Sequence, residues 1–168
     1  MASSRSATTT CPGCGMVRPR GGRDYDRKFH ASAECWEVFE EVLAREFQSP
    51  ALFGKFHQLT VDTYAVQHAG GRHPDKSVAI HLVGLYLVME EGLPPAAVAP
   101  RLQRIAGRKQ WPRLDPPAHR GDLTVLDVAS VQGGQAHTVR VAEWAGQVWS
   151  AWSGHHATVR ELTGRQRS

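Results

Sequence analysis

Hydrophobic residues recur every three or four positions along most of the chain, which is the spacing of amphipathic helices. The first such segment begins near Ser32 and runs to about Phe47, with acidic residues mostly on the opposite side. Its apolar positions are Trp36, Phe39, Val42, Leu43 and Phe47. Ser32 is a suitable N-cap, because its hydroxyl can accept a hydrogen bond from a free backbone N–H. The pattern predicts a first helix with one buried face.

A second helix is predicted directly after the first. Ser49 caps it and Pro50 occupies its first position, where the missing N–H costs nothing. It runs to His68, and Gly70 and Gly71 end it. Because the connection between the two helices is short, we expect them to be antiparallel neighbours.

The third helix starts near Asp75 or Ser77 and ends at Gly92. Its segment VAIHLVGLYLVM is apolar nearly all round, as expected of a central helix. One or two short helices interrupted by Pro100 are predicted next, and then, after a proline-rich loop, a short helix capped by Thr124. A last helix is predicted from about residue 136 to 162.

No alternation of apolar and polar residues extends far enough to predict a sheet. We therefore expect an all-α fold: one helical bundle of about five to six helices with a zinc-knuckle-like loop at its N-terminal end. At 168 residues the chain suits a single domain. We assign residues 1–10 to a disordered tail, 11–162 to the domain with its cysteine knuckle in 11–35, and 163–168 to a flexible C-terminus.

The composition of the chain indicates its cellular compartment and its net charge. The N-terminal segment has no apolar core of a secretory signal, and no window is apolar enough to span a membrane. Three cysteines are an odd number, which suits a reducing compartment better than a disulfide framework. We expect a cytoplasmic protein. The formal net charge of +4 is compatible with anionic partners but does not require them.

The cysteines carry the clearest chemical signal. Cys11 and Cys14 form a C-x2-C pair in CPGCG, whose turn directs two thiolates to one point, as in tetrahedral zinc centres. A second C-x2-C pair is absent, because Val38 stands where it would close, so Cys35 is the expected third ligand. In the alternative interpretation, Cys11 and Cys14 are a redox pair and Cys35 is a small core residue.

A histidine is the best candidate for the fourth ligand. His57 and His68 share one face of the second helix but lie about 16 Å apart along its axis, so one metal cannot bind both. His57 lies near the turn between the first two helices, whereas His68 lies at the knuckle end. We therefore predict His68 as the ligand and a packing role for His57. His30, five residues before Cys35, and a water molecule are the alternatives.

Further polar residues are predicted to lie near this end of the bundle. His81 falls level with Tyr64 and His68, and His155 shares the apolar face of the last helix, so both should point inward. Candidates for acid–base chemistry are Tyr64, His81 and His155. Candidates for a pocket or for supporting the ligands are His57, Asp62, Gln67 and His156. The residues expected at the surface are His73, His119 and His137.

Several segments together resemble an uncharacterised bacterial family, largely actinobacterial, of small Cys/His-rich helical proteins. The resemblance rests on CPGCG, ECWEVFEEVLAREF, HQLTVDTYAVQHAG, SVAIHLVGLYLVME, TVLDV and AWSGHHATVR. Its most specific element is the V-D-x-Y-x-V-Q-H run. The resemblance implies a single domain of unknown function, and members usually read Q-H-P-G where this chain has Q-H-A-G.

Three functions follow from these features. The first is a soluble zinc-binding helical protein, with three cysteines and one other ligand beside a polar His/Tyr cluster, whose partner is an unknown small molecule or protein. The second is a metal-dependent enzyme with an open zinc position and His81 or His155 as general base. The third, less favoured, is a nucleic-acid-binding regulator, because residues 101–120 hold six cationic residues and one acidic residue.

Overall fold

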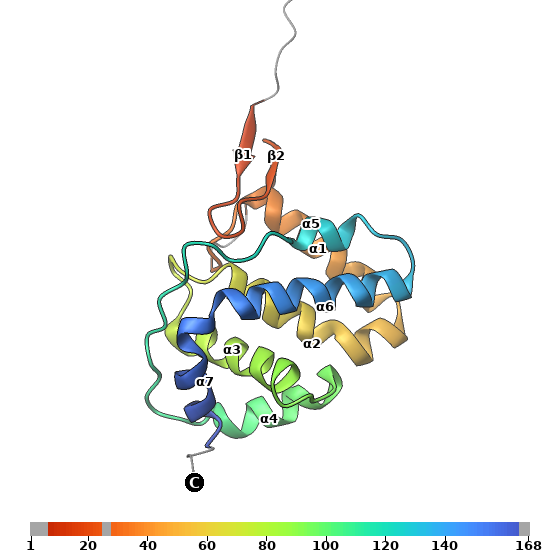
Figure 1. Ribbon diagram of the computed structural model, residues 1–168. Coiled ribbons are helices and arrows are strands. Elements are labelled where there is room, and N and C mark those ends of the chain that lie inside the picture. Colours follow the sequence, from red (N-terminus) through yellow and green to blue (C-terminus); the bar gives the residue numbers. More distant parts are fainter. Residues whose placement is uncertain (1–6, 25–27, 165–168) are drawn as a thin grey trace, which may run out of the picture.

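The computed structural model describes residues 7–24 and 28–164 of the chain (Figure 1). The strands are β1 (Thr8–Thr10) and β2 (Val17–Pro19). The α-helices are α1 (Ala33–Phe47), α2 (Pro50–Gln67), α3 (Asp75–Met89), α4 (Val98–Ile105), α5 (Val125–Ala129), α6 (Gly134–Ala151) and α7 (His156–Leu162). Short 3-10 helices cover Pro95–Ala97 (η1) and Ser153–His155 (η2). The helical bundle predicted from the sequence is confirmed.

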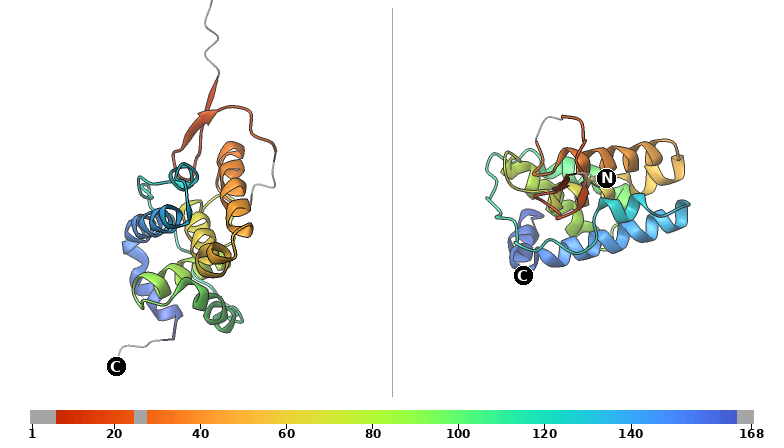
Figure 2. Two further views of the ribbon diagram at one scale, coloured as in Figure 1. Left: turned by 90° about the vertical axis from the view of Figure 1, so that its right-hand side faces the viewer. Right: turned by 90° about the horizontal axis from the view of Figure 1, so that it is seen from above.

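Helix α2 lies at the centre of the bundle and packs against α1, α3 and α6. Its second half is buried all round, and Tyr64, Ala65 and Val66 have no exposed surface. The hairpin projects from one end of the bundle, whereas α3, α4 and α7 form the other end (Figures 1 and 2). This arrangement places the C-terminal end of α2 beneath the hairpin.

The predicted helix starts follow from their capping residues. The Ser32 hydroxyl accepts a hydrogen bond from the Cys35 N–H at 3.1 Å, and Ser49 caps α2 in the same way. Thr124 begins α5 with a capping box, in which the Asp127 carboxylate accepts from the Thr124 N–H. Each cap satisfies a donor that would otherwise lack a partner at the helix end.

The hairpin was not predicted. Residues 8–10, which we expected in a disordered tail, pair antiparallel with residues 17–19, and Thr9 is opposite Arg18. Each strand has only three residues, which is too short to give an alternating pattern. The described residues do not include most of the two predicted terminal segments. Residues 1–6 of the predicted tail and residues 165–168 of the predicted flexible C-terminus lie outside them.

Two predictions for the C-terminal half were wrong in detail. Pro100 does not interrupt a helix: it is the third residue of α4, where a backbone N–H has no intrahelical acceptor to lose. The predicted last helix is divided, because α6 ends at Ala151 and α7 begins at His156. The weak helix formers Ser153 and Gly154 lie at the break.

Candidate metal centre

Four potential metal ligands converge beneath the hairpin. One ligand atom each from Cys11, Cys14, Cys35 and His68 lies within 4.8 Å of all the others. Cys14 is partly exposed and the other three residues are buried. In the part of the chain that the structure describes, no other group of three or more His, Cys, Asp or Glu side chains converges in this way.

The separations between the ligand atoms fit a tetrahedral centre. The Sγ atoms of Cys14 and Cys35 are 3.8 Å apart, and Cys35 Sγ is 3.3 Å from His68 Nε2. Bond lengths of about 2.3 Å to sulfur and 2.0–2.1 Å to nitrogen give tetrahedral edges of about 3.8 Å and about 3.5 Å. These two separations match the edges of a tetrahedral zinc site, and the remaining ones do not exceed 4.8 Å.

The CPGCG turn is shaped by backbone hydrogen bonds and by glycine. The Cys11 N–H donates to the Met16 carbonyl at 2.8 Å, and the Gly15 N–H donates to the Cys11 carbonyl at 2.9 Å. Gly15 has φ of +77°, a conformation that favours glycine. A Cβ atom on Gly13 would overlap the carbonyl oxygen of His30 and the ring of His68. The turn can approach His68 this closely only because Gly13 has no side chain.

Helices α1 and α2 supply the other two ligands. Cys35 lies in the first turn of α1, and His68 is the C-cap of α2. The Nδ1 atom of His68 is 2.8 Å from the Tyr64 carbonyl oxygen, which can only accept, so this nitrogen carries the proton. Nε2 therefore directs its lone pair toward the cysteines, as in metal-ligating histidines whose other N–H is held by a carbonyl.

Tyr64 packs against the candidate ligands, and the three thiols influence one another's pKa values. The Tyr64 ring stacks on Phe39 and on His68, and its hydroxyl donates to Cys35 Sγ at 3.6 Å. Hydrogen bonds from Cys14 and Cys35 hold the pKa of Cys11 far below its usual range. Interaction with Cys11 raises the pKa of Cys14 to about 12 and raises that of Cys35 as well. Without a cation, the buried cluster thus favours one thiolate and two thiols.

His30, the alternative ligand, contributes its backbone. Its N–H donates to the His68 carbonyl at 2.9 Å, which fixes the chain before α1 to the end of α2. Its ring is not part of the converging group. The geometry therefore brings His68, and not His30, to the three cysteines.

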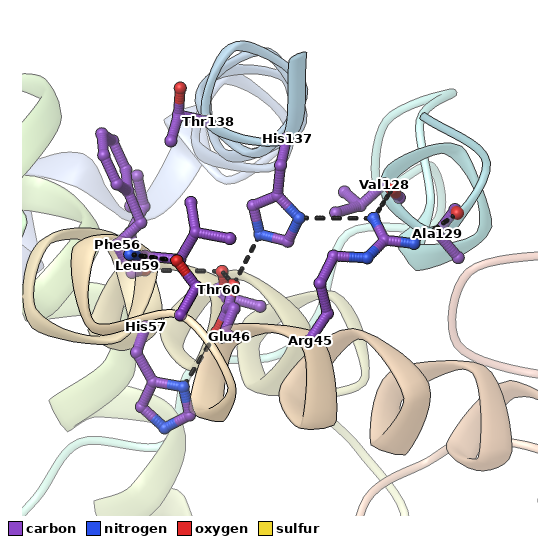
Figure 3. Close-up of polar contacts among 12 residues, drawn as sticks. Arg45, Glu46, Phe56, His57, Leu59, Thr60, Val128, Ala129, His137 and Thr138 are labelled. Carbon is purple, nitrogen blue, oxygen red and sulfur yellow. Dashed lines mark hydrogen bonds and ion pairs between the residues drawn. The ribbon is translucent and has the colours of Figure 1, made fainter. Parts of the chain in front are cut away.

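His57 lies far from the cysteines along α2, in a separate polar network (Figure 3). Its Nδ1 donates to Glu46 Oε2 at 2.8 Å, while Glu46 Oε1 accepts from His137 and Thr60. Glu46 and His137 have no exposed surface. Arg45 donates to carbonyl groups in the last turn of α5 and lies 3.5 Å from His137 Nδ1. The predicted surface position of His137 is wrong. Its ring is buried, and the hydrogen bond to the buried Glu46 carboxylate replaces the lost hydration.

A second histidine–carboxylate pair joins α2 to α3. His81 Nδ1 is 2.7 Å from Asp62 Oδ1, which also accepts from Gln58. Asp62 is fully buried, and its other oxygen packs against Gly84, where a Cβ atom would collide with it. Burial raises the pKa of Asp62, whereas the His81 bond opposes that shift. His81 is partly buried, and this pair joins the two central helices.

The remaining predicted residues have separate partners. Gln67 is buried: its amide donates to the Leu123 carbonyl and accepts from the Trp144 indole. His155 does not point into the core as predicted, because the helix breaks before it; its Nε2 lies 2.8 Å from the Asp115 carbonyl oxygen. The His156 ring stacks on the Trp149 ring, with the two ring centroids 3.7 Å apart. The three acid–base candidates therefore have different partners: Tyr64 contacts Cys35, His81 contacts Asp62 and His155 contacts Asp115.

Of the other two histidines expected at the surface, only His119 is exposed. His73 has an exposed fraction of 6%, lies 2.8 Å from the Ser77 hydroxyl and packs edge-on against Phe29. Loss of hydration lowers its pKa to about 4, so it is neutral at physiological pH. Nothing in the local pattern around His73 distinguishes it from a loop residue.

The arginines of residues 101–120 are partly used inside the fold. Arg120 donates to the carbonyls of Gln67 and Ala69, and Arg108 donates to that of Leu162. Arg113 pairs with Asp115 at 2.9 Å. These contacts reduce the charge that the segment could offer to nucleic acid.

None of the helices in residues 7–24 and 28–164 has the length and apolarity required to cross a bilayer.

Comparison with known proteins places the chain in a family. No curated protein sequence and no solved structure matches it. The model of the DUF5946 family matches residues 9–153, which include all four converging ligands. This agrees with the resemblance to a domain of unknown function, whereas the bacterial distribution and the diagnostic motif stay predictions. The chain belongs to DUF5946, a family of unknown function.

Proposed function

We propose that this chain is a zinc-binding helical protein and that its zinc ion is structural. The ligands in this proposal are Cys11, Cys14, Cys35 and His68. The observation that carries it is the convergence of their four ligand atoms within 4.8 Å, with His68 held in the tautomer that ligation requires.

The donor set supports zinc as the metal. Three soft sulfur donors and one imidazole in a tetrahedral arrangement are typical of zinc sites and unlike the oxygen-rich sites of magnesium or calcium. A divalent cation would also favour ionisation of Cys14 and Cys35, whose pKa values are raised while the thiols have only one another as partners. Three reduced cysteines suit a cytoplasmic location.

The ligand count supports a structural role over a catalytic one. Four protein ligands fill a tetrahedral zinc site and leave no position for an activated water. The ion would join the hairpin turn, the start of α1 and the end of α2. Because binding energy at such a site is also folding energy, loss of the metal should destabilise the hairpin end of the bundle first.

A matched pair of histidine variants tests this proposal. His68→Ala removes the imidazole donor, so it should weaken zinc binding and alter the visible spectrum of the cobalt-substituted protein. His57→Ala removes another imidazole of the same helix; this ring donates to Glu46 and packs on Phe47 and Phe53. It should leave the cobalt spectrum unchanged and lower the free energy of unfolding by about 1–3 kcal/mol. An unchanged spectrum in His68→Ala would contradict the assignment of this ligand.

A further inference from the structure

Helices α3, α4 and α7 form the end of the bundle opposite the hairpin (Figures 1 and 2). Residues of α3, of α4 and of the C-terminal end of α7 line a cavity there. Its volume is about 280 Å³. It is lined by Val83, Leu87, Arg101, Arg104, Ile105 and Thr163. Val83 and Leu87 have exposed fractions of 1% and form an apolar inner wall. This volume is close to the lower limit of ligand sites, about 300 Å³, so the cavity suits only a small molecule.

The rim of the cavity is cationic. Arg101 and Arg104 are three residues apart on α4, so their side chains extend from the same side of the helix. Arg101 Nη2 is 3.9 Å from Glu91 Oε2, which is longer than a hydrogen bond. Within the described part of the chain, Arg104 has no hydrogen bond or ion pair with an acidic group. The two guanidinium groups therefore have N–H donors to offer a ligand.

The surrounding sequence increases the positive potential. Residues 98–113 contain five basic residues and no acidic residue. Glu91 balances part of this charge beside Arg101, but Arg104 is exposed and further from it along α4. A basic rim around a low-dielectric wall attracts anions to the opening of the cavity.

We propose that this cavity binds a small amphipathic carboxylate. Its hydrocarbon part would lie against Val83, Leu87 and Ile105, and its carboxylate would accept hydrogen bonds from Arg101 and Arg104. A guanidinium matches a planar carboxylate with two parallel hydrogen bonds. An inorganic anion would leave the apolar wall unused, and a neutral hydrocarbon would leave both guanidinium groups without a partner.

Octanoate is a suitable probe, and it can be titrated into the full-length, metal-loaded, isotope-labelled protein while amide chemical shifts are followed by NMR. We expect saturable shifts at Val83, Leu87, Ile105 and Thr163. Octanol and octylammonium share the hydrocarbon chain but lack the negative charge, and acetate has the charge without the chain. All three should bind more weakly than octanoate.

Two variants test the assignment of residues. Arg104→Gln removes one rim charge and should weaken octanoate binding about five- to tenfold. Arg140→Gln is the matched control, because it removes an arginine on α6 that pairs with Glu143 at 3.4 Å and lies outside this cavity. Thr163→Phe should fill the cavity from its wall and abolish binding while both arginines remain.

Several results would overturn the proposal. Equal affinity for octanol or octylammonium would show that the rim charge is not used. Wild-type affinity in Arg104→Gln, or in a folded Thr163→Phe variant, would place the ligand elsewhere. The absence of saturable shifts at the lining residues would mean that the cavity does not take this class of ligand.

Discussion

The buried carboxylate of Glu46 offers the most informative perturbation of the fold. It accepts from His137 at 2.8 Å and from His57 at 2.8 Å, and Thr60 also donates to it. Arg45 can only donate, so His137 Nδ1 accepts from it and His137 Nε2 carries the proton. His137 therefore has no second way to satisfy its N–H if the carboxylate is lost.

Glu46→Gln tests the charge while keeping the shape of the side chain. The amide oxygen can replace Oε1 and keep His137 and Thr60, and the amide group can donate to His57, whose partly exposed ring can change tautomer. What is lost is charge assistance: bonds to a charged group contribute about 1.5–3 kcal/mol, and neutral bonds about 0.5–1.5 kcal/mol. Over three bonds we expect a loss of about 3 kcal/mol in the free energy of unfolding.

Glu46→Leu should cost more, because His137 is left buried without an acceptor; removing one partner of a buried charged network costs about 3–5 kcal/mol. The assay is urea unfolding of the metal-loaded proteins, followed by circular dichroism. Glu41→Gln, an exposed glutamate on the same helix, is the control and should change stability by less than about 0.5 kcal/mol. If Glu46→Gln behaves like this control, or Glu46→Leu costs no more than Glu46→Gln, the hydrogen bonds to Glu46 do not stabilise the fold as proposed.

Two further predictions concern other buried groups. Gly84→Ala places a Cβ against the Asp62 carboxylate and should destabilise the protein by about 1–3 kcal/mol in thermal unfolding. Gly54→Ala, in open space on α2, should be neutral or stabilising, and equal effects would contradict the close packing. His73 has a pKa of about 4 when folded, below its ordinary value of 6.5, so its contribution to stability is complete above pH 6.5 and is lost as pH falls toward 4. Between pH 7 and 4 the wild type should therefore lose about 3 kcal/mol more than His73→Gln in urea unfolding, and parallel profiles would refute this.

Much of the fold follows from local signals in the sequence. Ser32, Ser49 and Thr124 mark helix starts because their side chains satisfy free backbone donors within the same few residues. The cysteines and His68 could be combined because a short turn makes α1 and α2 antiparallel, which fixes which end of α2 faces the knuckle. Helix geometry and the order of the elements are sufficient to place His68 at the knuckle end of α2.

The surroundings of His137 and His73 could not be read from the sequence. His137 lies in the first turn of α6, where a histidine is usually solvated, but its acceptor is Glu46, 91 residues earlier in the chain. Glu46 lies on the buried face of α1, seven residues after Phe39 and four after Val42, so its burial follows from helical spacing, whereas its partners on α2 and α6 do not. Pairings of this kind depend on tertiary packing, and they override the local preference of each residue.

We propose that one zinc ion joins the hairpin, α1 and α2. The most direct test is elemental analysis of the natively purified protein combined with X-ray absorption at the zinc edge. We predict about one zinc per chain, with three sulfur ligands and one nitrogen ligand. Metal-free protein that retains full thermal stability with Cys11 and Cys14 joined in a disulfide would contradict the account, and so would zinc bound mainly by oxygen.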